Sequence, residues 1–354
     1  LMKNWKSTPV VTLFLAGTAA ISMAQATPSS AHHHNTVHHH TTKHHHTTKH
    51  HQASPPHHYY QNAAQCGDVL GPGGAYVLKE DLDCDVSPAL TVLDGAQLNL
   101  KGHTLTCGPG LSPIGIQMEG QKASVTNGNI LECDRGVVLG GYGKHSVSRI
   151  EYAHSIPGTH VAFIVETDGN RLVHNSATAC DGCFEIGGDG NRLIRNLAFD
   201  GPGIGFWIFS TGENNVLLHN VAESQFAGGF LIQGDANKLV KNEAIDTLFE
   251  NGSGFEISKG GERNELRRNM ATDNAGDGFR VFLAINNRLL GNVAEDNEKS
   301  GITVSGTDNV IARNRAFGNG DGVQFFDLND DNLNCDNNTW RKNKFDTSNA
   351  DCIE

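Results

Sequence analysis

The sequence predicts an all-β protein whose chain coils into a single-stranded, right-handed parallel β-helix, a solenoid of about 10–11 coils over residues 63–354. Two observations predict this fold. A short Asn-based motif recurs with copies 21 to 27 residues apart between Asn170 and Asn309. Within each repeat, apolar residues alternate with a period of two, and no stretch shows the 3.6-residue period of an α-helix.

The first residues are typical of an export signal. Lys3 and Lys6 precede an apolar run over residues 10–21, and Ala24-Gln25-Ala26 provides a small-residue cleavage site. We expect residues 1–26 to be a signal peptide and the mature protein to be secreted, periplasmic or on the cell surface. The apolar run is too short to cross a bilayer, and no later segment is long enough.

Residues 27–62 form a histidine-rich tract of low complexity. The tract has almost no apolar side chains to bury, so we expect a disordered tail. Neutral imidazoles bind zinc, copper or nickel, which makes the tail a candidate metal-capture segment, although the fold itself requires no cofactor. The alternative is an adhesive tail that becomes cationic in acid. The candidate ligands are His32, His33, His34, His38, His39, His40, His44, His45, His46, His50 and His51.

The repeat itself is an Asn, a Leu two places on, a second Asn at five and an Ala at seven. The copies begin at Asn170, Asn191, Asn215, Asn237, Asn264, Asn287, Asn309 and Asn338, with larger or branched apolar residues in the last two. A crossover helix does not fit in so short a repeat, whereas strands paired with their copies one coil later satisfy the backbone. The Asn at position five should then stack in a ladder of eight rungs at roughly 4.8 Å.

A second motif joins the Asn repeats, a Gly followed by an apolar residue, usually Phe, and another apolar residue two places further. We interpret the Gly as permitting a bend into the next strand. The copies begin at Gly205, Gly229, Gly254, Gly278 and Gly301.

Eight cysteines in an exported chain indicate disulfides. Cys66 with Cys84 and Cys335 with Cys352 bracket the two ends of the solenoid. Cys107 and Cys133 lie about one coil apart, within the reach of a disulfide. Cys180 and Cys183 form a C-x-x-C, which we interpret as a small structural loop because no helix follows to activate a thiol.

Together these motifs resemble the right-handed β-helix repeat family, the broad pectin-lyase-like group that includes periplasmic copper-accessory proteins. The resemblance covers roughly residues 64–354, including entry coils around residues 66–84 and 98–105 and a closing coil around 334–352. It implies the fold but no particular activity. The signatures of the family's pectin hydrolases are missing, and residues 142–145 match only the first two positions of an alginate-epimerase motif.

The strand after each Gly directs alternate residues outward, in two columns. The first column is Glu185, Trp207, Leu231, Glu256, Arg280, Thr303 and Gln324; the second is Gly187, Phe209, Gln233, Ser258, Phe282, Ser305 and Phe326. Aromatic rings beside polar groups suit a sugar chain. Trp207, Phe209, Phe282, Phe326 and Arg263 are therefore candidate substrate-binding residues, although a covering loop or mutual stacking would also account for the rings.

Within this face, Glu256, Lys259 and Arg280 are candidate catalytic residues of a polysaccharide lyase or epimerase. Abstraction of a proton beside a uronate carboxylate needs a base and a cation that stabilises the enolate. Ordinary ion pairs between neighbouring coils explain the same cluster, and the sequence favours that explanation.

Charge narrows the classes of partner. The chain carries a formal net charge of −12, and an acidic chain without a basic domain is a poor candidate for nucleic-acid binding. Position four of the Asn repeat is nevertheless basic in seven of eight copies. These side chains could dock acidic glycans; the simpler interpretation is a solvated stripe of charge. We therefore expect an exported β-helix that binds a polysaccharide or a surface partner along one face, with divalent metal ions on its tail and a lyase or epimerase as the alternative.

Overall fold

The structure is a computed structural model that describes residues 62–109, 113–155, 159–320 and 322–354. The proposed signal peptide and nearly all of the histidine tract lie outside these residues. Residue 62, which the sequence assigned to the tail, begins the first strand.

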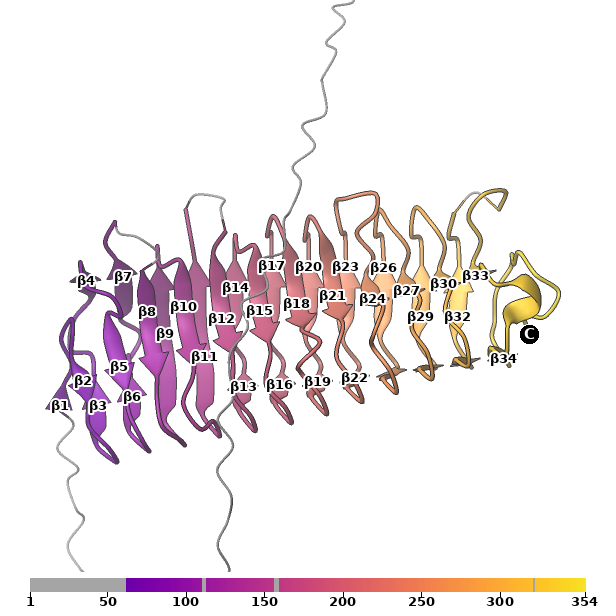
Figure 1. Cartoon of the computed structure of the whole chain (residues 1–354). Helices are drawn as coiled ribbons and strands as arrows, with labels where there is room; N and C mark the ends of the chain where they lie inside the picture. The colour runs from indigo at the N-terminus through magenta and orange to yellow at the C-terminus, as the bar shows by residue number, and fades with distance from the viewer. Residues whose placement is uncertain (1–61, 110–112, 156–158, 321) are drawn as a thin grey trace, which may run out of the picture. The chain divides into compact units, whose positions relative to one another are not determined.

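The described chain is a right-handed parallel β-helix, as predicted (Figure 1). One wall is a 12-stranded parallel sheet with one strand per coil, so about eleven turns separate its first and last strands. Its strands are β2 (Val69–Leu70), β5 (Leu90–Val92), β8 (Ile114–Met118), β10 (Arg135–Leu139), β12 (Val161–Val165), β15 (Gly182–Ile186), β18 (Ile204–Ile208), β21 (Gly228–Ile232), β24 (Phe255–Ile257), β27 (Phe279–Val281), β30 (Ile302–Val304) and β33 (Leu328–Asp330).

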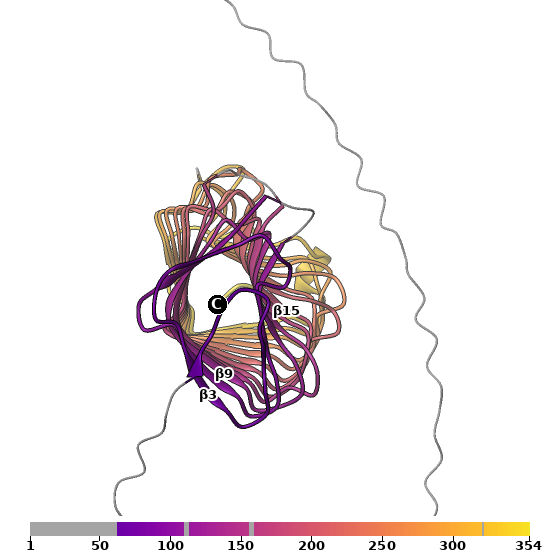
Figure 2. The same ribbon diagram turned by 90° about the vertical axis from the view of Figure 1, so that its left-hand side faces the viewer.

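The remaining strands belong to a 22-stranded sheet that supplies the other walls (Figure 2). Its first strands are β1 (Asn62–Ala63), β3 (Ala75–Val77), β4 (Leu82–Cys84), β6 (Gln97–Asn99), β7 (Thr104–Cys107), β9 (Ser124–Leu131), β11 (Ser146–Ala153), β13 (Arg171–Val173), β14 (Ser176–Thr178), β16 (Arg192–Ile194) and β17 (Leu197–Phe199). The later strands are β19 (Val216–Leu218), β20 (Val221–Glu223), β22 (Lys238–Val240), β23 (Glu243–Ile245), β25 (Glu265–Arg267), β26 (Met270–Thr272), β28 (Arg288–Leu290), β29 (Val293–Glu295), β31 (Val310–Ala312), β32 (Arg315–Phe317) and β34 (Thr339–Arg341).

A typical middle coil contains three short strands, such as β18, β19 and β20, as the spacing predicted. The two strands of the Asn repeat are joined by position four, which bends the chain. From His174 to Lys342 the residue at that position has φ between 54° and 64°. This left-handed conformation is uncommon for residues other than glycine, so the basic column marks a recurring corner.

The interior is filled by stacked columns of identical or similar side chains. Phe163, Phe184, Phe206, Phe230, Phe255 and Phe279 stack face to face, with ring centroids 4.5–4.9 Å apart. All six rings are buried, as are the Leu and Ala of the Asn repeats. Stacking of the rings stabilises the fold beyond what the burial of their apolar surface contributes.

The Gly of this motif serves close packing. The expected bend is present at Gly254, Gly278 and Gly301, whereas Gly205 and Gly229 lie within strands β18 and β21. None of these five glycines has a positive φ. A Cβ on Gly229 would lie 2.6 Å from the carbonyl oxygen of Gly254 and 2.8 Å from the Cβ of Ala244. The inward-facing Ala of the repeat leaves room for a hydrogen atom only.

The predicted Asn ladder of eight rungs is confirmed. From Asn175 to Asn343, each side-chain amide donates to the Oδ1 of the next rung at 3.0–3.2 Å. The same Oδ1 also accepts a backbone N–H from the preceding rung, for example from Asn220 to Asn242 at 2.9 Å. The ladder thereby satisfies buried backbone groups at the corner where the strands do not pair.

All four predicted disulfides are present. Cys66 is bonded to Cys84, Cys107 to Cys133, Cys180 to Cys183 and Cys335 to Cys352. They are consistent with an oxidising, extracellular environment. Among the described residues, no helix is long and apolar enough to cross a membrane.

Candidate functional site

The outer face of the 12-stranded sheet, called face B below, carries the two predicted columns. The register pairs Glu185, Trp207, Leu231, Glu256, Arg280 and Thr303 in succession, as expected. The prediction of Gln324 as the last residue of the first column was wrong, because Asn329 pairs with Thr303 at that place. The strand begins later in this coil, since the extra residues form a loop that contains Phe326.

The second column changes for the same reason. Asp331, whose N–H donates to Val304 at 2.9 Å, takes the place predicted for Phe326. Phe326 is partly buried in the preceding loop, where its N–H donates to Ser300 Oγ at 3.1 Å. The ring therefore does not belong to the aromatic columns of face B.

Trp207 and Phe209 form the aromatic part of face B. Both rings are partly exposed, and their centroids lie 4.5 Å apart at an interplanar angle of 44°. The indole N–H of Trp207 donates to Gln233 Oε1 at 3.1 Å. Mutual packing and this hydrogen bond hold the rings in place, so part of their apolar surface is presented in a fixed orientation.

The charged part of face B centres on Arg280. Its Nη1 lies 3.6 Å from Glu256 Oε2, and its guanidinium carbon lies 4.6 Å from the centroid of Phe282. Sequence reasoning had grouped Glu256 with Arg280, and the structure brings them together on adjacent strands. Arg280 is thus held between a carboxylate and an aromatic ring, with about a third of its side chain exposed.

A polar cleft of about 320 Å³ opens beside Arg280. Asp277 lies in its wall and accepts hydrogen bonds from Ser300 N at 3.0 Å and Thr303 Oγ1 at 3.1 Å. Lys299 lines the cleft as well, donating to Asn251 Oδ1 at 2.8 Å. This feature, called the Arg280 cleft below, brings Arg280 and Lys299 together with the carboxylates of Asp277, Glu250 and Asp331.

Sequence reasoning missed Asp277, although a signal was present. The residue directly before the Gly motif is Ile204, Gly228, Ser253, Asp277 or Ser300 in successive copies. Only one of these is ionisable. A carboxylate at a position that is otherwise uncharged marks the coil in which the outer wall is polar.

Burial affects both carboxyl groups near Arg280. It raises the pKa of Asp277 above its ordinary value, against the opposing effects of the Thr303 hydrogen bond and the Arg280 guanidinium. Burial also raises the pKa of Glu256, while Arg280 lowers it and Asp277 raises it further. Carboxyl groups with raised pKa values beside a cation in a cleft are typical of acid–base chemistry, although structural ion pairs produce the same pattern.

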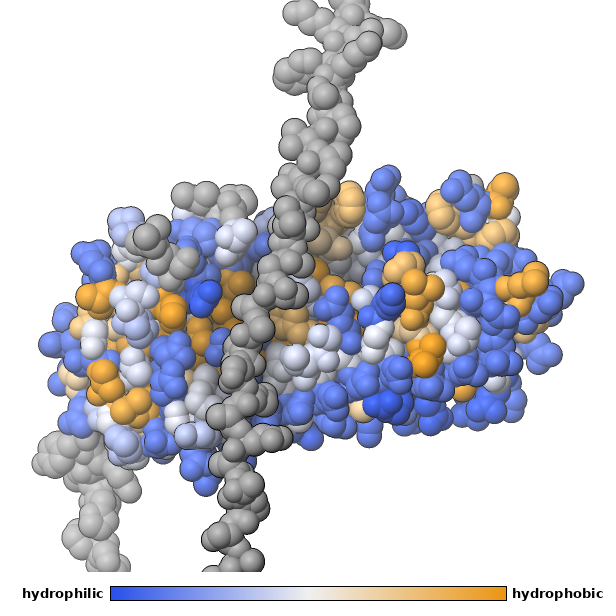
Figure 3. Space-filling model, in the orientation of Figure 1, coloured by the Kyte–Doolittle hydropathy of each residue, from blue (hydrophilic) through white to orange (hydrophobic). Residues whose placement is uncertain are grey.

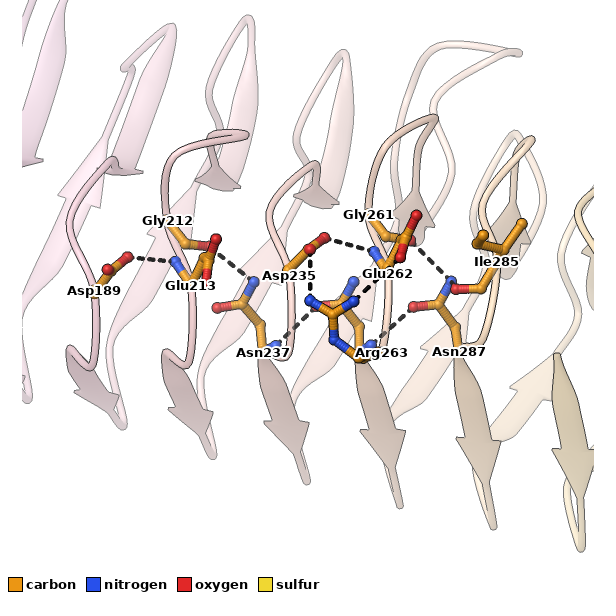
Figure 4. Close-up of polar contacts among 11 residues, drawn as sticks. Asp189, Gly212, Glu213, Asp235, Asn237, Gly261, Glu262, Arg263, Ile285 and Asn287 are labelled. Carbon is orange, nitrogen blue, oxygen red and sulfur yellow. Dashed lines mark hydrogen bonds and ion pairs between the residues drawn. The ribbon is translucent and has the colours of Figure 1, made fainter. Parts of the chain in front are cut away.

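Lys259 and Arg263 lie outside this arrangement. Lys259 is exposed in the turn after β24. The guanidinium of Arg263 contacts Asp235 at 2.9 Å and Glu262 at 3.2 Å in the turns of adjacent coils (Figure 4). Arg263, which the sequence offered as a substrate-binding residue, therefore joins two turns by an ion-pair network.

A second hollow on face B lies towards the N-terminus and has a volume of about 280 Å³. Glu185, Arg135 and Phe209 contribute to its lining. Burial raises the pKa of Glu185, with Asp181 adding to the increase and Arg135 opposing it. Phe209 thus belongs both to this hollow and to the aromatic pair with Trp207.

Two members of the basic column, Arg268 and Arg313, border a different concavity of about 420 Å³. It is lined by Arg267, Arg268, Arg288, Arg313 and Arg341, around Gly291. Gly291 is the one member of the column from His174 to Lys342 without a side chain. Because Gly291 has no side chain, a hollow remains among the surrounding arginines; it is called the arginine hollow below.

The view in Figure 3 shows hydrophobic residues scattered among hydrophilic ones over the middle of the β-helix. Hydrophilic residues form the lower edge of its C-terminal half.

The family model described as "Right handed beta helix region" matches residues 114–247 and 224–352. The chain belongs to this family. No curated protein matches the sequence.

Several solved structures share the fold at low sequence identity. The A-module of the Azotobacter vinelandii mannuronan C-5 epimerase AlgE6 superposes with a TM-score of 0.60 at 13% identity, covering 82% of this chain and 88% of that one. The periplasmic alginate epimerase AlgG gives 0.57 at 12% identity, with coverage of 80% and 76%. The Dettilon tailspike protein gives 0.51 at 12% identity, with coverage of 76% and 62%.

Proposed function

We propose that the protein is exported and binds a polysaccharide lying along face B, between the Trp207–Phe209 pair and the Arg280 cleft. The observation that carries this proposal is the partly exposed aromatic pair, fixed on the same sheet face as Arg280. Rings offer apolar surface to the faces of sugars, and a guanidinium recognises carboxylates. Strands spaced by about 4.8 Å provide a regular surface for a repeating polymer.

Similarity of fold agrees with this class of ligand. Two of the proteins named above are epimerases of alginate or mannuronan. At 12–13% identity the similarity concerns the fold alone. The ligand class therefore depends on the residues of face B and its cleft, where Arg280 and Lys299 are the groups that favour an acidic polymer.

The test is direct binding of the full chain to alginate, pectate, a glycosaminoglycan and a neutral glucan. Trp207→Ala and Arg280→Ala should each weaken acidic-polymer binding about tenfold, equivalent to about 1.4 kcal/mol. Arg313→Ala, in the arginine hollow, is the matched control and should bind normally. Unchanged binding in the face B variants, or loss only in Arg313→Ala, would contradict the proposal.

A second candidate function is a uronate lyase or epimerase centred on Glu256 and Arg280. It is favoured by one observation, the raised pKa of Glu256 beside an arginine. In this scheme Glu256 removes the proton next to the uronate carboxylate, and Arg280 neutralises the negative charge that develops on the enolate. Lys259, exposed in its turn, has no part in it.

Incubation with the same acidic polymers separates binding from catalysis. Unsaturated uronates absorb in the ultraviolet, and epimerisation changes the ratio of uronate epimers seen by NMR. Product that forms with the native chain and disappears in Glu256→Gln would establish the enzyme. Binding without product would leave the non-catalytic role as the function.

The histidine tract is assigned a separate role, weak multivalent capture of zinc, copper or nickel. Clustered imidazoles at close spacing provide several two-ligand sites without a fixed geometry. Replacing the tail histidines listed above by serine in the full chain should remove most of the bound metal in a calorimetric titration. Equal stoichiometry before and after replacement would rule out this role.

A further inference from the structure

Two consecutive turns near the N-terminal end of the 12-stranded sheet bring together imidazoles and carboxylates. Glu132 and Asp134 lie between β9 and β10, and one coil later His154 follows β11 and His160 precedes β12. Backbone hydrogen bonds hold the turns in register, from Glu132 N to Ala153 O at 3.1 Å and from Val161 N to Asp134 O at 2.8 Å. The position is outside both the Arg280 cleft and the histidine tract.

The imidazole rings of His154 and His160 stack with centroids 3.5 Å apart and planes 11° apart. His160 Nδ1 lies 3.2 Å from Asp134 Oδ1, and His154 Nδ1 lies 3.5 Å from Glu132 Oε2. One potential ligand atom each from Asp134, His154 and His160 lie within 4.8 Å of one another. Two imidazoles and the Asp134 carboxylate therefore converge on one small volume, and the Glu132 carboxylate lies beside His154.

One nitrogen of this cluster is buried without a hydrogen-bond partner. His160 Nδ1 is buried, and although the Asp134 oxygen is close, the angle is not that of a hydrogen bond. Burying a polar atom without compensation is costly. A ligand that accepts the nitrogen lone pair would satisfy it.

The surroundings hold the turn that carries Glu132 and Asp134. Cys133, between the two carboxylates, is buried and bonded to Cys107. Tyr152 is buried and donates its hydroxyl to Cys133 O at 2.7 Å. Glu132 accepts from Ser155 N at 3.1 Å and Ser155 Oγ at 2.9 Å. Such a supporting shell is what distinguishes a preorganised ligand set from a loose surface cluster.

We propose that Asp134, His154 and His160 bind a divalent transition-metal ion, with zinc as the preferred ion. Two imidazoles and a carboxylate suit zinc, whereas calcium and magnesium prefer oxygen ligands alone. Zinc takes nitrogen ligands at about 2.0–2.1 Å, so small side-chain rotations close the site. Glu132 or a water molecule supplies the fourth ligand.

The test uses the full chain, stripped with a chelator and titrated with zinc. His160→Gln and Asp134→Asn should each remove one equivalent of bound zinc. His219→Ala, an exposed histidine at a corner, is the control and should leave the stoichiometry unchanged. Circular dichroism and the metal-free Tm show whether each variant remains folded.

Crystals of the full chain soaked in zinc locate the ion by anomalous scattering at the zinc edge. We expect a peak between the Asp134 carboxylate and the two imidazoles, and a zinc-dependent rise in Tm that His160→Gln lacks. Zinc bound only at the histidine tract, with equal stoichiometry in native and His160→Gln chains, would overturn the proposal. A retained Tm rise in that folded variant would overturn it as well.

Discussion

At the residue scale, the Asn ladder shows how one side chain substitutes for missing strand pairing. Asn242 Oδ1 accepts the backbone N–H and the side-chain amide of Asn220, at 2.9 and 3.0 Å. Its Nδ2 donates to Leu217 O at 3.0 Å and to Asn269 Oδ1 at 3.1 Å. All hydrogen-bonding capacity of this buried amide is directed to neighbouring coils.

We therefore expect Asn242→Ala to destabilise the fold by about 2–4 kcal/mol, because a buried N–H and a buried carbonyl lose their partners. Denaturant-induced unfolding measures the change. Lys238→Ala, an exposed substitution in the adjacent strand β22, should stay within about 0.5 kcal/mol. Similar midpoints for the two variants would show that the ladder does not contribute as described.

A second prediction at this scale concerns Asp277. Because its pKa is raised in the folded state, the folded protein holds the proton more tightly than the unfolded chain does. Asp277 therefore stabilises the fold below its ordinary pKa of 3.8, and that contribution is lost as the pH rises through the folded-state pKa.

Asp277→Asn keeps an oxygen for Ser300 and Thr303 but cannot ionise. Its unfolding free energy should fall less steeply than that of the native protein as the pH rises above about 4. Chemical denaturation at a series of pH values measures the slope. Glu250→Gln, at an exposed carboxylate of the same cleft, is the matched control, and equal slopes in all three proteins would exclude a raised pKa.

At the scale of the element, close packing on the inner side of the 12-stranded sheet keeps its strands in regular register. Each Gly of the Gly motif faces an Ala on the Asn repeat, and the pair leaves no room for a second methyl group. Space rather than backbone conformation selects glycine here.

Gly229→Ala should therefore cost about 1–3 kcal/mol through overpacking against the Gly254 carbonyl and the Ala244 methyl. Gly187→Ala, directly after strand β15, is the control, because the nearest neighbour of the added Cβ would be Thr211 Oγ1 at 3.6 Å. The control should be neutral or slightly stabilising. Comparable losses of Tm in both variants would contradict the packing argument.

The sequence predicts elements well wherever side chains repeat with fixed offsets. The Asn and Phe motifs therefore located the strands and the corner ladder, and the spacing of the cysteines located the four disulfides. The register failed at Phe326, because the longer last repeat places extra residues before β33 and a spacing rule does not say where they bulge. A further ladder through Asn274, Asn297 and Asn319, ending on Asp327, was missed because only three coils carry it.

The candidate sites were less predictable for a related reason. Glu256 and Arg280 meet because they occupy the same column of adjacent strands, and period-two reasoning finds such pairs. Asp134 and His160 meet across turns of different length, where sequence separation gives no register. The Arg280 cleft likewise depends on Lys299 and Asp277, which lie outside the strands.

At the scale of the whole molecule, each coil contacts mainly the coils before and after it. The parallel pairings of both sheets join each strand to its copy one coil away. In such an array, stability is close to a sum of coil and interface contributions, and local damage stays local. The disulfides at Cys66–Cys84 and Cys335–Cys352 are placed where a coil has a neighbour on one side only.

Removing the C-terminal disulfide by Cys335→Ser with Cys352→Ser should therefore loosen the last coil alone. We expect faster amide hydrogen exchange in β34 and unchanged exchange in β18 and β21, since local openings of low free energy are confined to the damaged unit. The mirror-image control, Cys66→Ser with Cys84→Ser, should accelerate exchange in β3 and leave β34 protected. Faster exchange throughout the β-helix in either variant would mean that the molecule unfolds as one cooperative unit and that its terminal disulfides stabilise all coils together.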